Sequence, residues 1–277
     1  MNTSNVRIGF IGTGNMGSPL VKGVAGSGIF APDCINIYDI DRDKAEALSR
    51  ETGVNLAEGN KAVVERSDII ILAVKPNYIK PVLEECKSSF DKNKVLVSIA
   101  VGVSIKTYKD ILGEDVKVVR TMPNTPVSVR EGMTLVCFDK NTNNNDKEIV
   151  RKLFECVGKV EELEERLMSE VTALTGSSPA YVFIFIEAMA DAAVQSGIPR
   201  NLAYRLAAQA VLGSAKMVLE TGKHPGELKD QVCSPAGTTI EAVNTLEKHG
   251  FRYAVMDAMN ECTKRARDIG KMLAGDK

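Results

Sequence analysis

The first 160 residues alternate short apolar runs with amphipathic stretches of helical period. The apolar runs predict strands at 6–11, 35–38, 54–58, 68–74, 94–101 and 116–122, and helices are predicted between them, for example over 15–27, 41–52 and 60–67. The run DIIILAV at 68–74 has no polar interruption after its first residue, which is typical of a strand buried on both faces. This alternation predicts an α/β fold with a parallel, doubly wound sheet.

The pattern changes near residue 160, where the strand signal ends. Five helical segments are predicted after KVEELEE at 159–165: about 165–174, 179–196, 200–220, 226–232 and 239–274, the last broken at Gly250. We therefore expect a dinucleotide-binding domain over 1–163 and an all-helical domain over 164–277. The asparagine-rich run at 141–146 predicts a surface loop within the first domain.

One predicted helix, AYVFIFIEAMADAAVQ at 180–195, is apolar nearly all round. Such a helix is normally buried on all sides, and a small helical domain cannot easily enclose it. The pattern favours association between subunits, and the alternative is a helix buried within one subunit.

Composition narrows the class of protein. The chain of 277 residues is 44% hydrophobic and 26% charged, with a formal net charge of −1, so no basic excess favours nucleic acid or an anionic membrane. No apolar run reaches the roughly 18 residues of a membrane span, and the N-terminus shows no leader pattern. Six scattered cysteines without metal-ligand spacing fit a reducing cytoplasm, and only two histidines disfavour a zinc or serine–histidine site.

A glycine-rich motif, G-x-G-x-x-G, follows the first predicted strand and opens the first predicted helix. It comprises Gly12, Thr13, Gly14, Asn15, Met16 and Gly17. In this context the glycines allow a tight turn, close approach of a pyrophosphate and close packing of helix on strand, while the helix N-terminus attracts the phosphates. The motif predicts a nicotinamide dinucleotide site, and the alternative is a glycine-rich turn without function.

Asp39 ends the second predicted strand, 22 residues after Gly17. An acid there hydrogen-bonds the ribose 2′-hydroxyl and repels a 2′-phosphate, which favours NADH over NADPH. Arg42 could swing to meet a phosphate, and Asp39 could instead cap the next helix.

Small residues and prolines follow three later strands, where ligands of open sheets bind. They include Ala73, Val74, Lys75 and Pro76 after one strand, Ala100 after the next, and MPNTP at 122–126 after the third. They predict a shelf for the nicotinamide ring, and Asn124 could bond its carboxamide or the substrate. The alternative is ordinary turn chemistry.

The helical half contains a second candidate site in CSPAGTT at 233–239. Thr238 and Glu241 match a capping box, which would leave the amides of Gly237, Thr238 and Thr239 at a positive helix end. Those amides, with hydroxyls of Ser234 and one threonine, could bind a substrate carboxylate; the alternative is simple capping. The segment at 175–192 has no Lys, His or Arg to protonate an alkoxide, so an already protonated cyclic imine suits this site better than a ketone.

These motifs together resemble the 1-pyrroline-5-carboxylate reductase family. The resemblance spans nearly the whole chain, through IGFIGTGNMG at 8–17, NKAVVERSDIIILAVKP at 60–76, VRTMPNTPVSVREGMT at 119–134, LTGSSPAYVFIFIEAMADA at 174–192 and HPGELKDQVCSPAGTTIEAV at 224–243. It implies hydride transfer from NADPH or NADH to a cyclic imine, giving L-proline in the last step of proline biosynthesis. It also implies dimers with interlocked helical domains, and larger rings of dimers.

The resemblance assigns roles residue by residue. Asn60 would contact the adenosine side of the cofactor. Ser234, Gly237, Thr238 and Thr239 would hold the substrate carboxylate and ring nitrogen, with Thr239 bonding the nitrogen. The sequence departs from the family at Asp39, since the family often carries a neutral residue there followed by Arg, where this chain has Ile40. A β-hydroxyacid dehydrogenase and a non-catalytic NADH sensor are the competing hypotheses.

Overall fold

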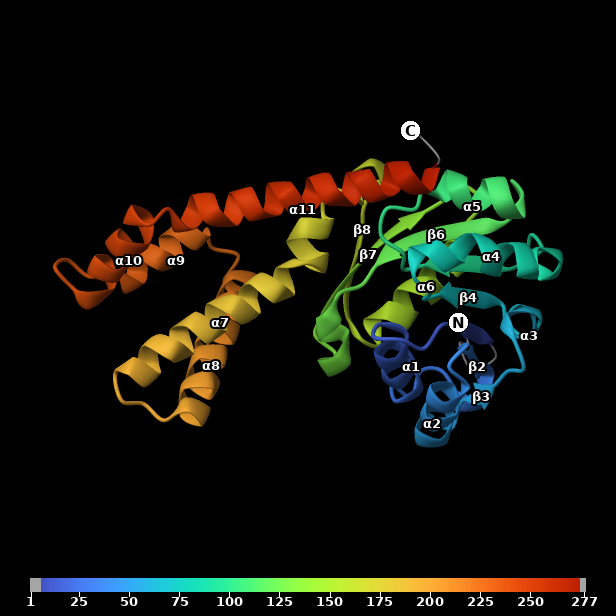
Figure 1. Cartoon of the computed structure of the whole chain (residues 1–277), viewed down its shortest axis with the longest axis horizontal. Coiled ribbons are helices and arrows are strands. Elements are labelled where there is room, and N and C mark those ends of the chain that lie inside the picture. Colours follow the sequence, from blue (N-terminus) through green and yellow to red (C-terminus); the bar gives the residue numbers. More distant parts are fainter. Residues whose placement is uncertain (1–5, 275–277) are drawn as a thin grey trace. The chain divides into compact units, whose positions relative to one another are not determined.

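The structure, a computed structural model, describes residues 6–274, except for the side chains of residues 273 and 274. The expectation that the N-terminus shows no leader pattern rests partly on residues 1–5, which lie outside the described residues. The chain forms two compact units: unit 1 runs to Ser177 and resumes at Cys262, and unit 2 is Ser178–Glu261 (Figure 1). The expected boundary between 163 and 164 stays a prediction.

Unit 1 is built on one eight-stranded sheet with the order β3-β2-β1-β4-β5-β6-β7-β8. The pairs are parallel except β6 with β7. The strands are β1 Ile8–Ile11, β2 Ile35–Tyr38, β3 Asn55–Leu56, β4 Ile69–Leu72, β5 Val95–Ser98, β6 Lys117–Met122, β7 Gly132–Phe138 and β8 Gly158–Glu162. The predicted parallel sheet is confirmed in β1 to β6, whereas β7 and β8 were not predicted.

Helices cover both faces of this sheet because alternate strand residues point to opposite sides. In β4, Ile69 and Ile71 join the core beneath α1 Gly17–Ala25, α2 Arg42–Thr52 and α6 Asn144–Glu155. Ile70 and Leu72 join the core beneath α3 Asn60–Glu65, α4 Pro76–Cys86 and α5 Ile105–Leu112. The doubly wound fold expected from the alternation of strand and helix patterns is therefore confirmed, and it places the carboxyl ends of β1, β4 and β5 side by side.

The predicted loop at 141–146 is wrong in its second half, because α6 already begins at Asn144. The side chain of Asn143 accepts a hydrogen bond from the Asp146 amide at 2.9 Å, and the Asp146 carboxylate accepts one from the Asn143 amide at 3.2 Å. Asparagine and aspartate favour both loops and helix caps, so composition alone did not separate the two.

Unit 2 is helical throughout. It contains α7 Ser178–Gln195, α8 Arg200–Thr221, α9 Pro225–Val232, α10 Thr238–Lys248 and the first part of α11 Phe251–Ala274, with Gly250 at φ 70° between the last two. These match four predicted segments. The predicted helix at 165–174 is instead a 3₁₀ turn, Glu165–Leu167, and a π-helical segment, Thr172–Gly176.

Apolar side chains of α7 lie on the surface of this single chain. Only Ala190 of the helix is buried, while Phe183 is 62% and Ile184 66% exposed. By length and composition Thr172–Gln195 could also cross a membrane, with 17% of its most apolar window buried in the described structure. The α7 surface therefore needs a covering partner of some kind.

Candidate functional site

The glycine-rich loop lies between β1 and α1, and each glycine has a distinct steric reason. Gly12 has φ 98°, and a Cβ there would lie 2.7 Å from the carbonyl oxygen of Ala73. A Cβ on Gly17 would lie 2.2 Å from the carbonyl oxygen of Gly12, whereas one on Gly14 would meet nothing within 4 Å. Helix α1 begins after Met16 without a side-chain cap. The Ser18 amide donates to the Gly14 carbonyl at 3.0 Å and Pro19 has no amide hydrogen. The loop thus offers open space at Gly14 and a positive helix end without a side-chain cap, which suit an approaching pyrophosphate.

Asp39 braces this loop from the end of β2. Its carboxylate accepts hydrogen bonds from the Thr13 amide at 2.6 Å, the Thr13 hydroxyl at 3.2 Å and the Asp41 amide at 2.9 Å. The capping alternative for Asp39 is excluded, because Asp41 is the N-cap of α2. Arg42 pairs with Glu46 at 3.2 Å on the helix surface.

A cavity of about 360 Å³ opens beside the loop and brings four predicted cofactor residues together. Gly12, Asp39, Asn60 and Val74 line it, together with residues that were not predicted: Ile11, Tyr38, Ile40, Tyr78, Val82 and Glu85. Ile40 is 92% and Tyr78 59% exposed, so both present apolar surface to this opening. Asn60 donates to Glu85 at 2.9 Å. Tyr78 could have been anticipated, since it falls in the first turn of the helix that Pro76 opens.

The predicted nicotinamide shelf occupies the carboxyl ends of β4, β5 and β6. Lys75 is the exposed N-cap of α4 with Pro76 next, Ala73 donates its amide to Ile11 at 2.8 Å, and Ala100 is buried. Asn124 is 8% exposed, and both ends of its amide serve the fold. It donates to the Thr175 carbonyl at 3.0 Å and accepts from the Met133 amide at 2.9 Å. Its ligand role stays a prediction that relies on the second N–H of the same amide.

Unit 2 holds the other predicted group at the start of α10. The Gly237 amide donates to the Ser234 carbonyl at 3.0 Å, which closes a turn with Ala236 at φ 54°. A Cβ on Gly237 would lie 2.3 Å from the Ser234 hydroxyl. Ser234 and Thr238 are exposed and Thr239 is half-buried. The turn thus presents two exposed hydroxyls at the entrance of a helix.

The predicted capping box at Thr238 is wrong. Gly237 is the N-cap, with extended backbone and no side-chain cap, and Thr238 is the first helical residue. The helix begins one residue early because the tight turn at Ser234 delivers Gly237 into the cap position. The first-turn amides of α10 are consequently uncapped, as they are in α1.

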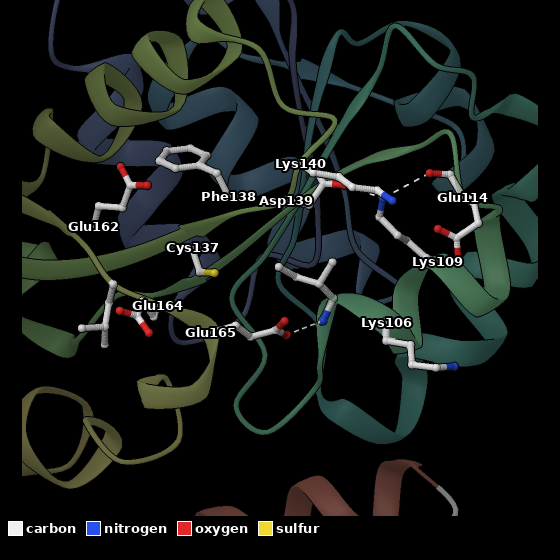
Figure 2. Close-up of a pocket in the computed structure, with 12 residues that line it drawn as sticks. Lys106, Lys109, Glu114, Cys137, Phe138, Asp139, Lys140, Glu162, Glu164 and Glu165 are labelled. Carbon is white, nitrogen blue, oxygen red and sulfur yellow. Dashed lines mark hydrogen bonds and ion pairs between the residues drawn. The ribbon is translucent and has the colours of Figure 1, made fainter.

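A larger cavity of about 720 Å³ lies in unit 1 between α5, β7 and β8 (Figure 2). Within it the Lys109 ammonium lies 2.6 Å from the Asp139 carboxylate, and the Glu165 carboxylate accepts a hydrogen bond from the Ile105 amide at 2.7 Å. It contains none of the predicted site residues.

The sheet order and the glycine cradle define unit 1 as a nicotinamide-dinucleotide-binding unit of the Rossmann type. Two family models match different parts of the chain. One, described as "NADP oxidoreductase coenzyme F420-dependent", matches residues 7–102, and "Pyrroline-5-carboxylate reductase dimerisation" matches residues 165–269.

Curated relatives extend the match to nearly the whole chain. The chain is 50% identical to pyrroline-5-carboxylate reductase of Escherichia coli (strain K12), over 96% of this chain and 98% of that protein. It is 45% identical to that of Methanosarcina acetivorans, over 96% and 99%. A solved pyrroline carboxylate reductase of Plasmodium falciparum with NADP bound has a TM-score of 0.89 at 35% identity, covering 97% of this chain and 99% of that one. The chain belongs to the pyrroline-5-carboxylate reductase family.

Proposed function

We propose that this protein reduces 1-pyrroline-5-carboxylate to L-proline, the last step of proline biosynthesis, with a nicotinamide cofactor. The observation that carries the proposal is 50% sequence identity to a pyrroline-5-carboxylate reductase over almost the full length of both chains. The uncapped start of α10 supports it, because a helix N-terminus with free amides suits the carboxylate of such a substrate.

The residues of α10 would bind and orient the substrate. We assign the carboxylate to the amides of Thr238 and Thr239 and to the hydroxyl of Ser234, and the ring nitrogen to the Thr239 hydroxyl. Gly237 contributes through its backbone shape, because its own amide already donates to the Ser234 carbonyl and closes the turn. The hydride adds to the imine carbon, and the electron pair of the C=N π bond moves to the protonated nitrogen and leaves a neutral amine. No side chain therefore has to donate a proton at that step. The work of these residues is therefore positioning and charge complementarity.

Unit 1 fits a dinucleotide, which supplies the hydride when it is bound. The cradle at Gly14, where a side chain would meet nothing within 4 Å, leaves room for the pyrophosphate. Asn60, Ile40 and Tyr78 would line the adenosine side. Ala73, Val74, Lys75, Pro76 and Ala100 would lie beneath the nicotinamide. We infer a preference for NADH over NADPH, because the Asp39 carboxylate repels a 2′-phosphate and apolar Ile40 offers it no compensating charge.

Unit 2 would mediate self-association in the cytoplasm. A predominantly apolar groove of about 310 Å³ runs between α7 and α11, lined by Tyr181, Ile184, Phe185, Ala188, Phe251, Ala254, Val255 and Ala258. The dimerisation model covers both helices. We propose that a second copy covers this groove, that rings of dimers follow, and that neither a membrane nor a nucleic acid is the partner.

The decisive experiment follows the oxidation of NADH and of NADPH in parallel, with the cyclic imine as acceptor. Thr239→Ala should lower turnover while leaving NADH affinity intact. Thr245→Ala is the matched control, because that hydroxyl bonds only the Glu241 carbonyl, at 3.0 Å, within the same helix. If neither cofactor is oxidised, or if a hydroxyacid with NAD is the better substrate, the proposed function is wrong.

A further inference from the structure

The loop at 99–104, here called the shelf loop, connects β5 to α5 and carries Ala100. Its backbone is attached to the core by a buried polar chain. The Ala100 amide donates to the Ser98 hydroxyl at 3.2 Å, and the same hydroxyl lies 2.5 Å from the hydroxyl of Tyr108. Ser98 and Tyr108 are both fully buried. The Ser98 carbonyl in turn accepts from the Thr121 hydroxyl of β6 at 3.0 Å.

Tyr108 is the largest of the fully buried side chains, and its hydroxyl lies within an otherwise apolar core. A buried hydroxyl is costly unless it is hydrogen-bonded, and here the bond to Ser98 satisfies it. Burial raises the pKa of Tyr108, with smaller opposing effects from Ser98 and Arg120. The phenol is therefore protonated at every pH at which the enzyme would work, and it can donate to Ser98 throughout.

The other end of the shelf loop is held by different groups. The Ile105 amide donates to Glu165 at 2.7 Å, as the dashed line in Figure 2 shows, and Glu165 lies 3.6 Å from Arg120. Gly102, at φ 83°, lies so close to α11 that a Cβ there would come within 3.1 Å of the Gly270 amide nitrogen. The near end is held by the Ile99 amide, which donates to the Leu72 carbonyl of β4 at 3.3 Å. Between these fixed points Ala100 packs in the apolar core, and its own amide is oriented by the bond to Ser98.

We propose that Tyr108 is a positioning residue for hydride transfer, acting through the Ser98 hydroxyl on the Ala100 backbone beneath the nicotinamide. The inference rests on the proposed function, and it adds a residue that no ligand touches. Tyr108 lies one helical turn inside α5, and its hydroxyl is bonded to Ser98 at the end of β5. The position of α5 therefore helps to fix the end of β5. Hydride transfer is sensitive to such placement, since a displacement of about 1 Å can cost about a hundredfold in rate.

The test is Tyr108→Phe, which removes one oxygen and preserves the ring. We expect kcat to fall roughly tenfold, because the displacement of Ala100 should be smaller than 1 Å. The dissociation constant for NADH should rise about fivefold, because a displaced Ala100 backbone would pack less closely beneath the nicotinamide ring. The dissociation constant for ADP-ribose, which lacks the nicotinamide ring, should not change. A general loss of structure would weaken both ligands together.

Two further variants make the result unambiguous. Ser98→Ala should reproduce the effects of Tyr108→Phe, and the double variant should be no worse than either single one, since both residues act through one bond. Ile70→Val is the stability control, because Ile70 is fully buried in the same core cluster but has no polar link to the shelf loop. It should lower the melting temperature without changing the NADH to ADP-ribose affinity ratio.

Specific outcomes would overturn the inference. These are a folded Tyr108→Phe with wild-type kcat and NADH affinity, equal weakening of NADH and ADP-ribose, or additive effects in the double variant. An inactive wild-type enzyme that still binds NADH would instead refute the proposed function, and the affinity ratio would still test Tyr108.

Discussion

Two glycines of the cofactor loop are expected to differ in what they lose when replaced by alanine: Gly17→Ala should lose stability, and Gly14→Ala should lose NADH affinity. At Gly17 the new methyl would lie 2.2 Å from the Gly12 carbonyl oxygen and 3.0 Å from its carbon. At Gly14 the methyl would meet nothing within 4 Å. Both residues carry ordinary backbone torsions, so the difference is steric and not conformational.

The magnitudes follow from these distances. Ordinary contact begins near 3.4 Å, so Gly17→Ala must separate α1 from β1 by more than 1 Å against backbone atoms that cannot rotate away. Overpacking costs about 1–3 kcal/mol, and we place this case near the upper end. That corresponds to a fall in melting temperature of roughly 6–12 °C. Gly14→Ala should change stability by less than about 0.5 kcal/mol, yet its methyl would occupy the space left for the pyrophosphate and weaken NADH at least tenfold.

The assay is urea or thermal unfolding without cofactor, combined with NADH binding followed by fluorescence. Cofactor must be absent from the unfolding experiment, because a ligand bound to the native state raises apparent stability. A Gly17→Ala protein as stable as the wild type would refute the packing argument. A Gly14→Ala protein with wild-type NADH affinity would show that the pyrophosphate lies elsewhere.

Three further predictions concern other parts of the chain. Asp39→Ser should shift preference toward NADPH but lower affinity for both cofactors, because it also removes the acceptor of the Thr13 amide. Asp39→Asn keeps an acceptor for that amide and is the control. Dissociation constants of NADH and NADPH measured in parallel check this. Ala236→Gly should raise the free energy of unfolding by about 0.5–1 kcal/mol in urea, since φ 54° strains a residue with a Cβ. Partial burial raises the pKa of Asp68, but hydrogen bonds from Arg7 outweigh it and leave the pKa below its ordinary value. Asp68→Asn should therefore destabilise the protein at pH 7. The difference in stability from the wild type should shrink as the pH falls below about 4, because the wild-type carboxylate is then protonated. An unchanged gap between Asp68→Asn and the wild type at pH 3 and pH 7 would contradict that assignment.

The sequence predicted the parts of unit 1 whose signals are local. Apolar runs identified β1, β2, β4, β5 and β6. The run in β4 is apolar throughout, as is typical of a strand buried on both faces, whereas β2 and β6 also bury Asn36 and Arg120. It missed β7 and β8 at the edge beyond β6. In β8 the segment Gly158–Glu162 alternates half-buried and exposed positions and carries three charged residues, so its pattern is that of a surface segment.

Side-chain roles were harder to predict than elements, because they depend on residues distant in sequence. Asp39 lines the cavity beside the glycine-rich loop, and its predicted cofactor role stays a prediction. Its bonds to Thr13, which reach 26 positions back along the chain, could not be predicted from local sequence. Asn124 was chosen for its position after a strand, and only the fold reveals the Thr175 carbonyl 51 positions away that takes its amide. The chain from Tyr108 to Ala100 has no motif at all.

The starts of α1 in unit 1 and of α10 in unit 2 share one feature, a missing side-chain cap. Helices α2, α5, α6 and α9 each begin with a residue whose side chain accepts a hydrogen bond from a first-turn amide. These residues are Asp41, Ser104, Asn143 and His224. Helices α1, α3, α4, α8 and α10 begin without one. A missing cap typically costs about 1 kcal/mol of stability, and a bound ligand that accepts those amides would offset that cost. Of these five, α1, α3 and α4 border the proposed cofactor site and α10 opens the proposed carboxylate site. The capping box predicted at Thr238 would have blocked that site, because a side-chain oxygen would already hold an amide that the substrate needs.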